Sequence, residues 1–179
     1  MTAHWRAPAG LHVESARLPD EGELPSLDGA TGWLNSPPLT PAGLRGKVVV
    51  VDFWTYTCIN WLRQLPYVRA WAERYKDHGL VTIGAHTPEF SFEHDVDNVR
   101  RAVQEMRLEY PIAIDSDYAI WQAFDNAYWP ALYFVDAEGA IRDGTVAPKA
   151  RPHRREARID PEPVPFRHDA FRRTLLRLI

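Results

Sequence analysis

Residues 47–61, KVVVVDFWTYTCINW, decide the fold of this chain. The first part, KVVVVDFW, is a run of β-branched and aromatic residues after Lys47, interrupted only by Asp52, which is typical of a strand buried on both faces of a sheet. After it, apolar residues recur at steps of three and four, which predicts a helix that begins near Ile59. Cys58, the only cysteine in the chain, therefore stands where a buried strand gives way to a helix.

The rest of the chain continues this alternation. Short apolar runs predict further strands, and apolar residues spaced three and four apart predict further helices. The predicted strands are residues 80–86, 110–115, 131–136 and a weak strand around 141, and the predicted helices are 96–106 and 116–126. An order β-α-β-α-β-β indicates an α/β sheet with helices on both faces.

Length and composition limit the classes of protein. The chain has 179 residues, 45% of them apolar, which fits one domain with a sizeable core. It has no run of about 18 apolar residues, so we expect no membrane-spanning helix. The N-terminal residues lack the apolar segment of a secretory signal, so the expected compartment is the cytoplasm. A single cysteine excludes an intramolecular disulfide and a Cys-x-x-Cys zinc site.

Composition also divides the chain into three parts. Residues 1–23, rich in Pro, Gly and charge, are predicted to form an N-terminal arm, and residues 24–142 the folded domain. Residues 143–179 are predicted to form a divergent Arg/Pro-rich tail that ends in a short helix. Residues 151–179 carry eight Arg against four acidic residues. Basic tails can bind nucleic acid, but a solvated tail is the interpretation we prefer, so no nucleic-acid partner is expected.

Cys58 occupies a position that favours reactivity. The N–H groups in the first turn of a helix are unpaired, and the helix dipole places partial positive charge there. A thiolate at this point is stabilised and acts as a nucleophile at neutral pH. The alternative is a buried, inert cysteine. The ends of strands in open α/β sheets are where functional sites lie, which favours the reactive interpretation.

The motif VDFWTYTC at residues 51–58 resembles the active-site entrance of thioredoxins. The longer block LRGKVVVVDFWTYTCINWLRQLPYVRAWAERY at residues 44–75 resembles the redoxin domains of the TlpA/DipZ type, which are related to the AhpC/TSA peroxidases. The resemblance covers residues 24–142. It implies a thioredoxin-like fold, in which a central mixed β-sheet is flanked by helices on both faces.

The resemblance also assigns roles to residues. Asp52 stands where thioredoxins keep a buried carboxylate that exchanges protons during disulfide chemistry, and its apolar neighbours favour burial, which raises a carboxyl pKa. Pro66 stands where they keep the proline that kinks the active-site helix. Trp129 and Pro130 stand where they keep a cis-proline that faces the sulfur. These two residues are therefore expected to shape the surface on which substrate docks.

Trp61 departs from the family pattern, because it replaces the second cysteine of C-x-x-C. In the dithiol mechanism that second thiol attacks the mixed disulfide and frees the product. Without it, Cys58 can form a mixed disulfide but needs an external thiol to complete the cycle. We expect Trp61 to lie one helical turn along, as an apolar cover near the sulfur that contacts substrate.

The segment TYTC also fits the T-x-x-C that precedes the peroxidatic cysteine of AhpC/TSA proteins. The hydroxyls of Thr55 and Thr57 are expected to polarise the surroundings of the sulfur. That family has a proline seven residues before the cysteine, where Val51 stands here, and an arginine near the sulfur, for which Arg63 and Arg142 are the candidates. A peroxidase with one cysteine would pass through sulfenic acid and be returned by an external thiol.

Polar residues after the second predicted strand complete the candidate site. Glu89 is expected to position a loop near the substrate rather than to take part in catalysis. His86 and His94 lack a metal-ligand spacing, so no metal is expected, and no phosphate-binding loop or other cofactor motif is present.

The sequence therefore predicts a thiol-dependent oxidoreductase of the redoxin, or antioxidant, type. Cys58 would reduce a peroxide or exchange with a disulfide, and an external thiol reductant or a thiol-bearing protein would recycle it. The alternative is a catalytically inactive thioredoxin-fold binding module, for which the loss of the second sulfur at Trp61 is the argument.

Overall fold

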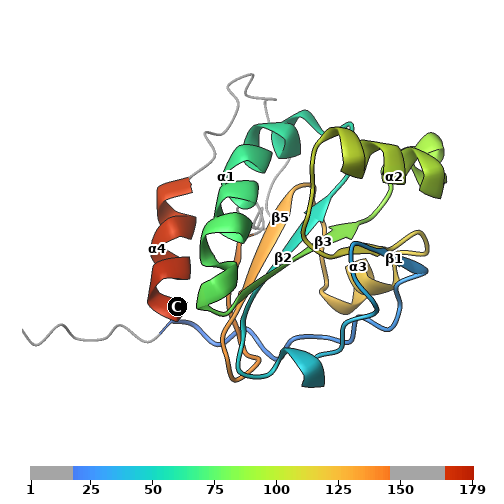
Figure 1. Cartoon of the computed structure of the whole chain (residues 1–179). Helices are drawn as coiled ribbons and strands as arrows, with labels where there is room; N and C mark the ends of the chain where they lie inside the picture. Colours follow the sequence, from blue (N-terminus) through green and yellow to red (C-terminus); the bar gives the residue numbers. More distant parts are fainter. Residues whose placement is uncertain (1–17, 146–167) are drawn as a thin grey trace, which may run out of the picture.

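A mixed β-sheet forms the centre of the fold. The computed structural model describes residues 18–145 and 168–179, and in them the sheet has six strands in the order β1-β4-β3-β2-β5-β6 (Figure 1). The strands are β1 (Gly32–Leu34), β2 (Val48–Trp54), β3 (Leu80–His86), β4 (Ile112–Ile114), β5 (Ala131–Val135) and β6 (Ile141–Thr145). Strands β2, β3 and β4 are parallel, whereas β1, β5 and β6 pair antiparallel to their neighbours. The predicted mixed α/β sheet is confirmed.

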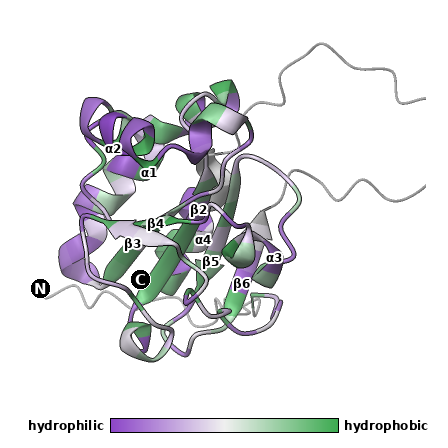
Figure 2. Cartoon of the chain, turned by 90° about the vertical axis from the view of Figure 1, so that its right-hand side faces the viewer, coloured by the Kyte–Doolittle hydropathy of each residue, from purple (hydrophilic) through white to green (hydrophobic). Residues whose placement is uncertain are grey.

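Helices cover both faces of this sheet (Figure 1). The longer helices are α1 (Ile59–Tyr75), α2 (Val96–Glu105) and α4 (His168–Leu178), and the shorter ones are α3 (Ala119–Ala123), η1 (Ala42–Leu44), η2 (Lys76–His78) and η3 (Ser91–His94). Apolar side chains of α1, α2 and α4 share one core with alternate residues of β2, whereas α3 and η1 share a second core with the residues between them. Both faces of β2 are therefore buried, as its largely apolar sequence predicts (Figure 2).

Helix α1 begins at Ile59, as predicted, and contains Pro66. It ends at Tyr75, and a short 3-10 turn, η2, then leads to Gly79, which has φ 87°. Glycine adopts this left-handed conformation without strain, so Gly79 ends the helical segment in the manner expected of a C-terminal cap.

The structure extends the fold beyond the predicted limits at both ends. The backbone of residues 21–24 pairs with the β5–β6 hairpin: Glu21 N donates to Ile141 O (2.9 Å), Ile141 N donates to Gly22 O (2.7 Å) and Leu24 N donates to Gly139 O (2.9 Å). The last residues of the predicted arm thus border the sheet, and β6 continues past residue 142 to Thr145.

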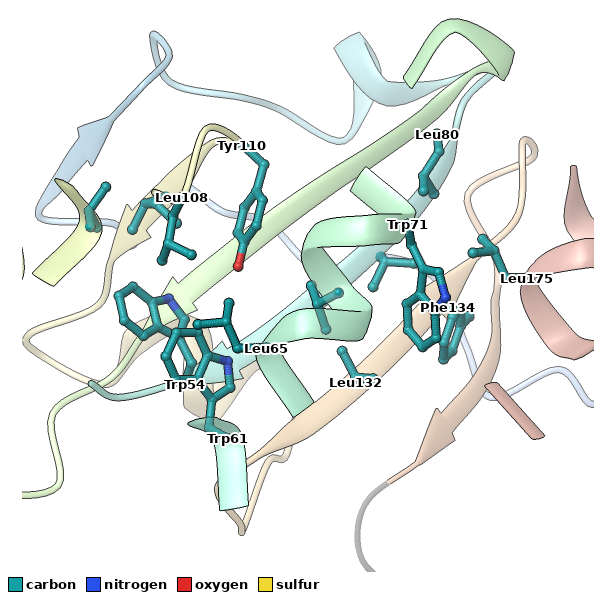
Figure 3. Packing of buried hydrophobic residues seen from close by; sticks show 14 of the residues in the cluster. Trp54, Trp61, Leu65, Trp71, Leu80, Leu108, Tyr110, Leu132, Phe134 and Leu175 are labelled. Carbon is teal, nitrogen blue, oxygen red and sulfur yellow. The ribbon is translucent and has the colours of Figure 1, made fainter. Parts of the chain in front are cut away.

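The helix predicted at the end of the tail packs on the domain. Leu175 of α4 has 0% exposure and lies in the same core as Trp71 of α1 and Phe134 of β5 (Figures 1 and 3). Apolar packing of this kind is what holds a terminal helix in place. The predicted arm before residue 18 and the predicted tail at residues 146–167 lie outside the described residues.

Candidate active site

Cys58 is the N-cap residue of α1, with an extended backbone (φ −69°, ψ 108°), and its side chain is half-buried. Its N–H donates to Thr55 O (3.2 Å), which closes a tight turn after β2, and its carbonyl accepts the N–H of Leu62 (2.9 Å), which begins the helix. Cys58 therefore lies at the N-terminal end of α1, where the unpaired N–H groups of the helix begin. This is the strand–helix junction that the sequence predicts.

Asp52 lies at the centre of β2 and has 0% exposure. Its Oδ2 accepts a hydrogen bond from Trp61 Nε1 (2.8 Å) and its Oδ1 accepts one from Gln64 Nε2 (3.0 Å). Burial raises the pKa of this carboxyl from 3.8 to about 8, although the two hydrogen bonds act to lower it. Asp52 is therefore a buried acid that gains and loses a proton close to neutral pH.

Trp61 supports Asp52 and does not form part of the surface. Its side chain has 0% exposure, and its ring stacks on that of Trp54 with centroids 4.5 Å apart and planes at 27° (Figure 3). The prediction that Trp61 contacts substrate needs correction, because this position of α1 faces the sheet and a fully buried ring has no surface to offer. The indole N–H instead takes one of the two hydrogen bonds to the buried carboxyl.

Glu93 of η3 is a buried residue that sequence reasoning missed. Its Oε1 accepts from Thr57 Oγ1 (2.6 Å), and its Oε2 accepts from the backbone N–H groups of Glu89 (2.7 Å) and Phe90 (3.0 Å). Burial acts to raise the pKa of Glu93, but the hydroxyls of Thr55 and Thr57 and the two backbone N–H groups outweigh it and lower the pKa. A glutamate three residues after the start of a helical turn is the available signal, because its carboxylate can reach back to cap that turn.

The two threonines of the turn differ in their surroundings. Thr57 is exposed and donates to Glu93, whereas Thr55 has 0% exposure and its Oγ1 forms no hydrogen bond of standard geometry with the described residues. Both hydroxyls nevertheless contribute to the lowered pKa of Glu93. Their expected effect on the sulfur stays a prediction.

The Trp129–Pro130 peptide bond is cis, as the resemblance implies. Trp129 is held from two sides. Its Nε1 donates to Thr87 O (3.0 Å), and its ring centroid lies 4.1 Å from that of Trp121, with the ring planes at 36°. Both Trp129 and Pro130 are half-buried, so part of each residue is accessible to solvent. The expected role of this pair in docking stays a prediction.

His86 ends β3 and is buried, with 1% exposure. The ring of Tyr56 stacks on it with centroids 5.9 Å apart, and neither imidazole nitrogen has a hydrogen-bond partner among the described residues. Burial lowers the pKa of His86 to about 4 against the opposing effect of Glu93, so the imidazole is neutral at pH 7. Glu89, the other residue predicted after this strand, has an exposed side chain and contributes its backbone N–H to the Glu93 cluster.

Arg142 and Arg63 are the two arginines that were predicted as partners of the sulfur. Arg142 of β6 forms ion pairs with Asp136 and Asp20 beside the β5–β6 hairpin. Arg63 is exposed on α1. Within residues 18–145 and 168–179, no group of three or more His, Cys, Asp or Glu side chains is placed to hold a metal ion. The helices in these ranges are also too short or too polar to cross a membrane.

The family of the chain follows from its comparison with known proteins. Residues 27–143 match the model of the AhpC/TSA family, which covers more than half of the chain and includes β2, Cys58 and the cis-proline. The chain belongs to the AhpC/TSA family. Among solved structures, this AhpC/TSA chain is similar to a thioredoxin-like protein in its oxidised form, with 31% identity, a TM-score of 0.64 and coverage of 69% of this chain and 82% of the other. The predicted thioredoxin-like fold is confirmed.

Curated relatives extend this similarity. Over 131 residues the chain is 48% identical to Protein DipZ of Mycobacterium bovis, which covers 72% of this chain but only 19% of DipZ. It is 35% identical over 119 residues to human NHL repeat-containing protein 2, covering 65% of this chain and 16% of the relative. The thiol-disulfide oxidoreductase YkuV of Bacillus subtilis is 29% identical over 119 residues, covering 66% of this chain and 80% of YkuV.

Proposed function

We propose that this AhpC/TSA-family chain is a thiol–disulfide oxidoreductase that uses Cys58 as its only nucleophile and depends on an external thiol. The observation that carries the proposal is the hydrogen bond from Trp61 to Asp52 (2.8 Å). The buried carboxyl implied by the resemblance is retained, while an indole donor occupies the position of the second sulfur. Similarity to YkuV, which is named for this activity and of which the chain spans 80%, supports the reaction class.

The proposed cycle balances without a second cysteine. The Cys58 thiolate attacks one sulfur of a disulfide RSSR′, which forms a Cys58–S–S–R mixed disulfide and releases R′S⁻. An external thiolate R″S⁻ then displaces RS⁻ and takes its place on Cys58. A second R″S⁻ attacks that mixed disulfide, so R″SSR″ leaves and Cys58 is again a thiolate. The substrate disulfide is reduced to two thiols, and two external thiols are oxidised to one disulfide.

Asp52 supplies the proton chemistry in this proposal. The Cys58 thiol must lose a proton before it attacks, and the departing thiolates must gain one. A carboxyl with a pKa of about 8 exchanges protons at neutral pH in either direction. Trp61, in the first turn of the helix that Cys58 caps, holds this carboxyl in place.

We prefer disulfide exchange to peroxide reduction as the reaction of Cys58 because of the surroundings of Arg142 and Arg63. A peroxidatic site of the AhpC/TSA type would need an arginine beside the sulfur, yet Arg142 is paired with Asp136 and Asp20. Arg63 is the remaining candidate, and its side chain is exposed. Reaction with hydrogen peroxide is therefore expected to be slow compared with reaction with a disulfide.

Intact-protein mass spectrometry of the whole chain tests the proposal. The native protein is mixed with the neutral disulfide 2-hydroxyethyl disulfide, or with hydrogen peroxide, and then with an external monothiol. We expect one mercaptoethanol adduct per chain, its removal by the monothiol at a rate proportional to thiol concentration, and no adduct in Cys58→Ser. An unreactive native thiol that reacts only after denaturation would support the binding-module alternative. A faster reaction with peroxide, through sulfenic acid, would support a peroxidase; either result would overturn the proposal.

A further inference from the structure

Three aromatic side chains form a row beside the turn that carries Cys58: Tyr56, Phe92 and Phe90, here called the aromatic ledge. The rings of Phe90 and Phe92 are stacked, with centroids 5.7 Å apart and planes at 7°. The centroid of the Tyr56 ring lies 6.3 Å from that of Phe92. Phe90 and Phe92 are 50% and 51% exposed, and Ile59, which follows Cys58, is 58% exposed. Neighbouring exposed aromatic rings such as Phe90 and Phe92 mark a binding site more often than scattered apolar residues do.

The aromatic ledge is fixed to the cysteine turn by two hydrogen bonds. Tyr56 Oη donates to Phe92 O (3.1 Å), and Thr57 Oγ1 donates to Glu93 Oε1 (2.6 Å). Glu93 in turn accepts the N–H of Phe90 (3.0 Å), so the loop between β3 and η3 is closed on itself. A surface held in one arrangement before binding loses little conformational entropy when a partner docks on it.

Acidic residues flank the aromatic ledge. Glu89 and Asp95 lie at either end of the Phe90–Glu93 segment with exposed side chains. Burial raises the pKa of Tyr56, and the charges of Glu93 and Asp95 raise it further, while Arg101 opposes them. A negative potential at this point repels anionic disulfides and attracts cationic ones.

We propose that the disulfides that Cys58 attacks are carried on basic polypeptides, in which an apolar side chain next to the half-cystine docks on the aromatic ledge. This inference rests on the proposed function, which it narrows to a substrate class. In the reacting complex the Cys58 thiolate attacks the half-cystine sulfur, the polypeptide becomes joined to Cys58, and the other half of the disulfide leaves as a thiolate that takes up a proton. Small anionic disulfides such as oxidised glutathione gain nothing from the ledge and are repelled by its charge.

Matched peptide disulfides test the inference with the whole chain. Short cysteine peptides are prepared as mixed disulfides with 2-thiopyridine, so that the leaving group is the same in each and its release is followed by absorbance. One peptide places phenylalanine before the cysteine between lysines, a second replaces phenylalanine by serine, and a third replaces the lysines by glutamates. The pyridyl disulfide of mercaptoethanol is the small neutral reference.

We expect the phenylalanine peptide to react about tenfold faster than the serine peptide, as docking of one ring would allow. The acidic peptide should be slowest, and its deficit should shrink as salt screens the charges. In the double variant Phe90→Ser/Phe92→Ser the phenylalanine-to-serine ratio should fall to about one. Because the readout is a ratio within one variant, a general change in the reactivity of Cys58 cancels. The control Leu176→Ser, which removes a 46%-exposed apolar residue from α4, should keep the wild-type ratio.

Two results would overturn the inference while leaving the proposed function intact. One is equal rates for all peptides in the wild type, with rapid reaction of the neutral reference. The other is sedimentation showing a wild-type dimer that the double variant converts to monomer with an unchanged peptide ratio, because the ledge would then hold a second copy of the chain. If the neutral reference also fails to react, the result contradicts the proposed function itself, and the inference that rests on it.

Discussion

Replacement of Asp52 by asparagine should stabilise the protein, and by more as the pH rises. The folded carboxyl has a pKa of about 8 because burial disfavours its charge, against 3.8 for an unperturbed group. Between these values the unfolded chain ionises Asp52 while the folded chain keeps it protonated. The folded state thus binds more protons, so the contribution of Asp52 to stability falls as the pH rises through this window.

The magnitude follows from the size of that window. Each pH unit inside it is worth ~1.4 kcal/mol, so Asp52 costs ~3 kcal/mol more stability at pH 7 than at pH 5. Asparagine carries no such cost, although its NH₂ group accepts no hydrogen bond, so the carboxylate oxygen that it replaces loses the bond from Trp61 or from Gln64. The loss of this hydrogen bond does not depend on pH. The difference in unfolding free energy between variant and wild type is therefore best read from its change with pH, and not from its value at one pH.

Urea unfolding of wild type and Asp52→Asn at several pH values between 5 and 7 measures this difference. We expect the advantage of the variant to grow by ~2–3 kcal/mol across the range. Val50→Ala, a buried change on the same strand without a titratable group, should show a deficit that is flat with pH. A flat difference for Asp52→Asn as well would show that the folded carboxyl is ionised throughout, and would refute the reasoning about its burial and its proton exchange.

Three further predictions test other parts of the structure. Trp61→Phe keeps a ring on Trp54 but removes the donor to Asp52, so it should raise the Asp52 pKa further and cost ~1–3 kcal/mol in urea unfolding. Glu93→Ala should speed amide hydrogen exchange at Glu89 and Phe90, because it removes the oxygen that accepts both N–H groups; in the wild type the same loosening should appear only as the pH falls below 4.5 through the lowered pKa of Glu93. Leu175→Ala should cost ~2–4 kcal/mol, whereas Leu176→Ala, exposed on the same helix, should cost less than ~0.5 kcal/mol; equal effects would mean that α4 is not docked in solution.

Sequence reasoning located the features that depend on local pattern. The unbroken run before Asp52 predicts a buried strand and hence a buried carboxyl, and the change of period after Cys58 predicts the start of α1. The cis bond before Pro130 follows from the resemblance. For the strand and the helix, neighbouring residues in the chain carry the information, so no tertiary contact has to be known.

Features that depend on distant contacts were not predictable in the same way. Trp61 was expected to meet substrate, because its sequence position indicates a helix but not which way the indole N–H points. The position of Glu93 indicates a carboxylate that caps its own turn, but it does not indicate the bond to Thr57, which is 36 residues away in the chain. Leu175 follows a segment of low apolar periodicity, so its burial against β5 and α1 depends on a chain path that only the fold determines.

The buried indole of Trp61, which stands in place of a second cysteine, has a consequence for the lifetime of a mixed disulfide on Cys58. In a dithiol protein the resolving sulfur is tethered, so the mixed disulfide meets a high effective concentration of thiol and lasts only briefly. In this chain, if Cys58 works as proposed, the lifetime of the mixed disulfide is inversely proportional to the concentration of free thiol around it. The fraction of chains joined to a partner would then measure the reducing strength of the surroundings: a partner captured when thiols are scarce is released when they are restored.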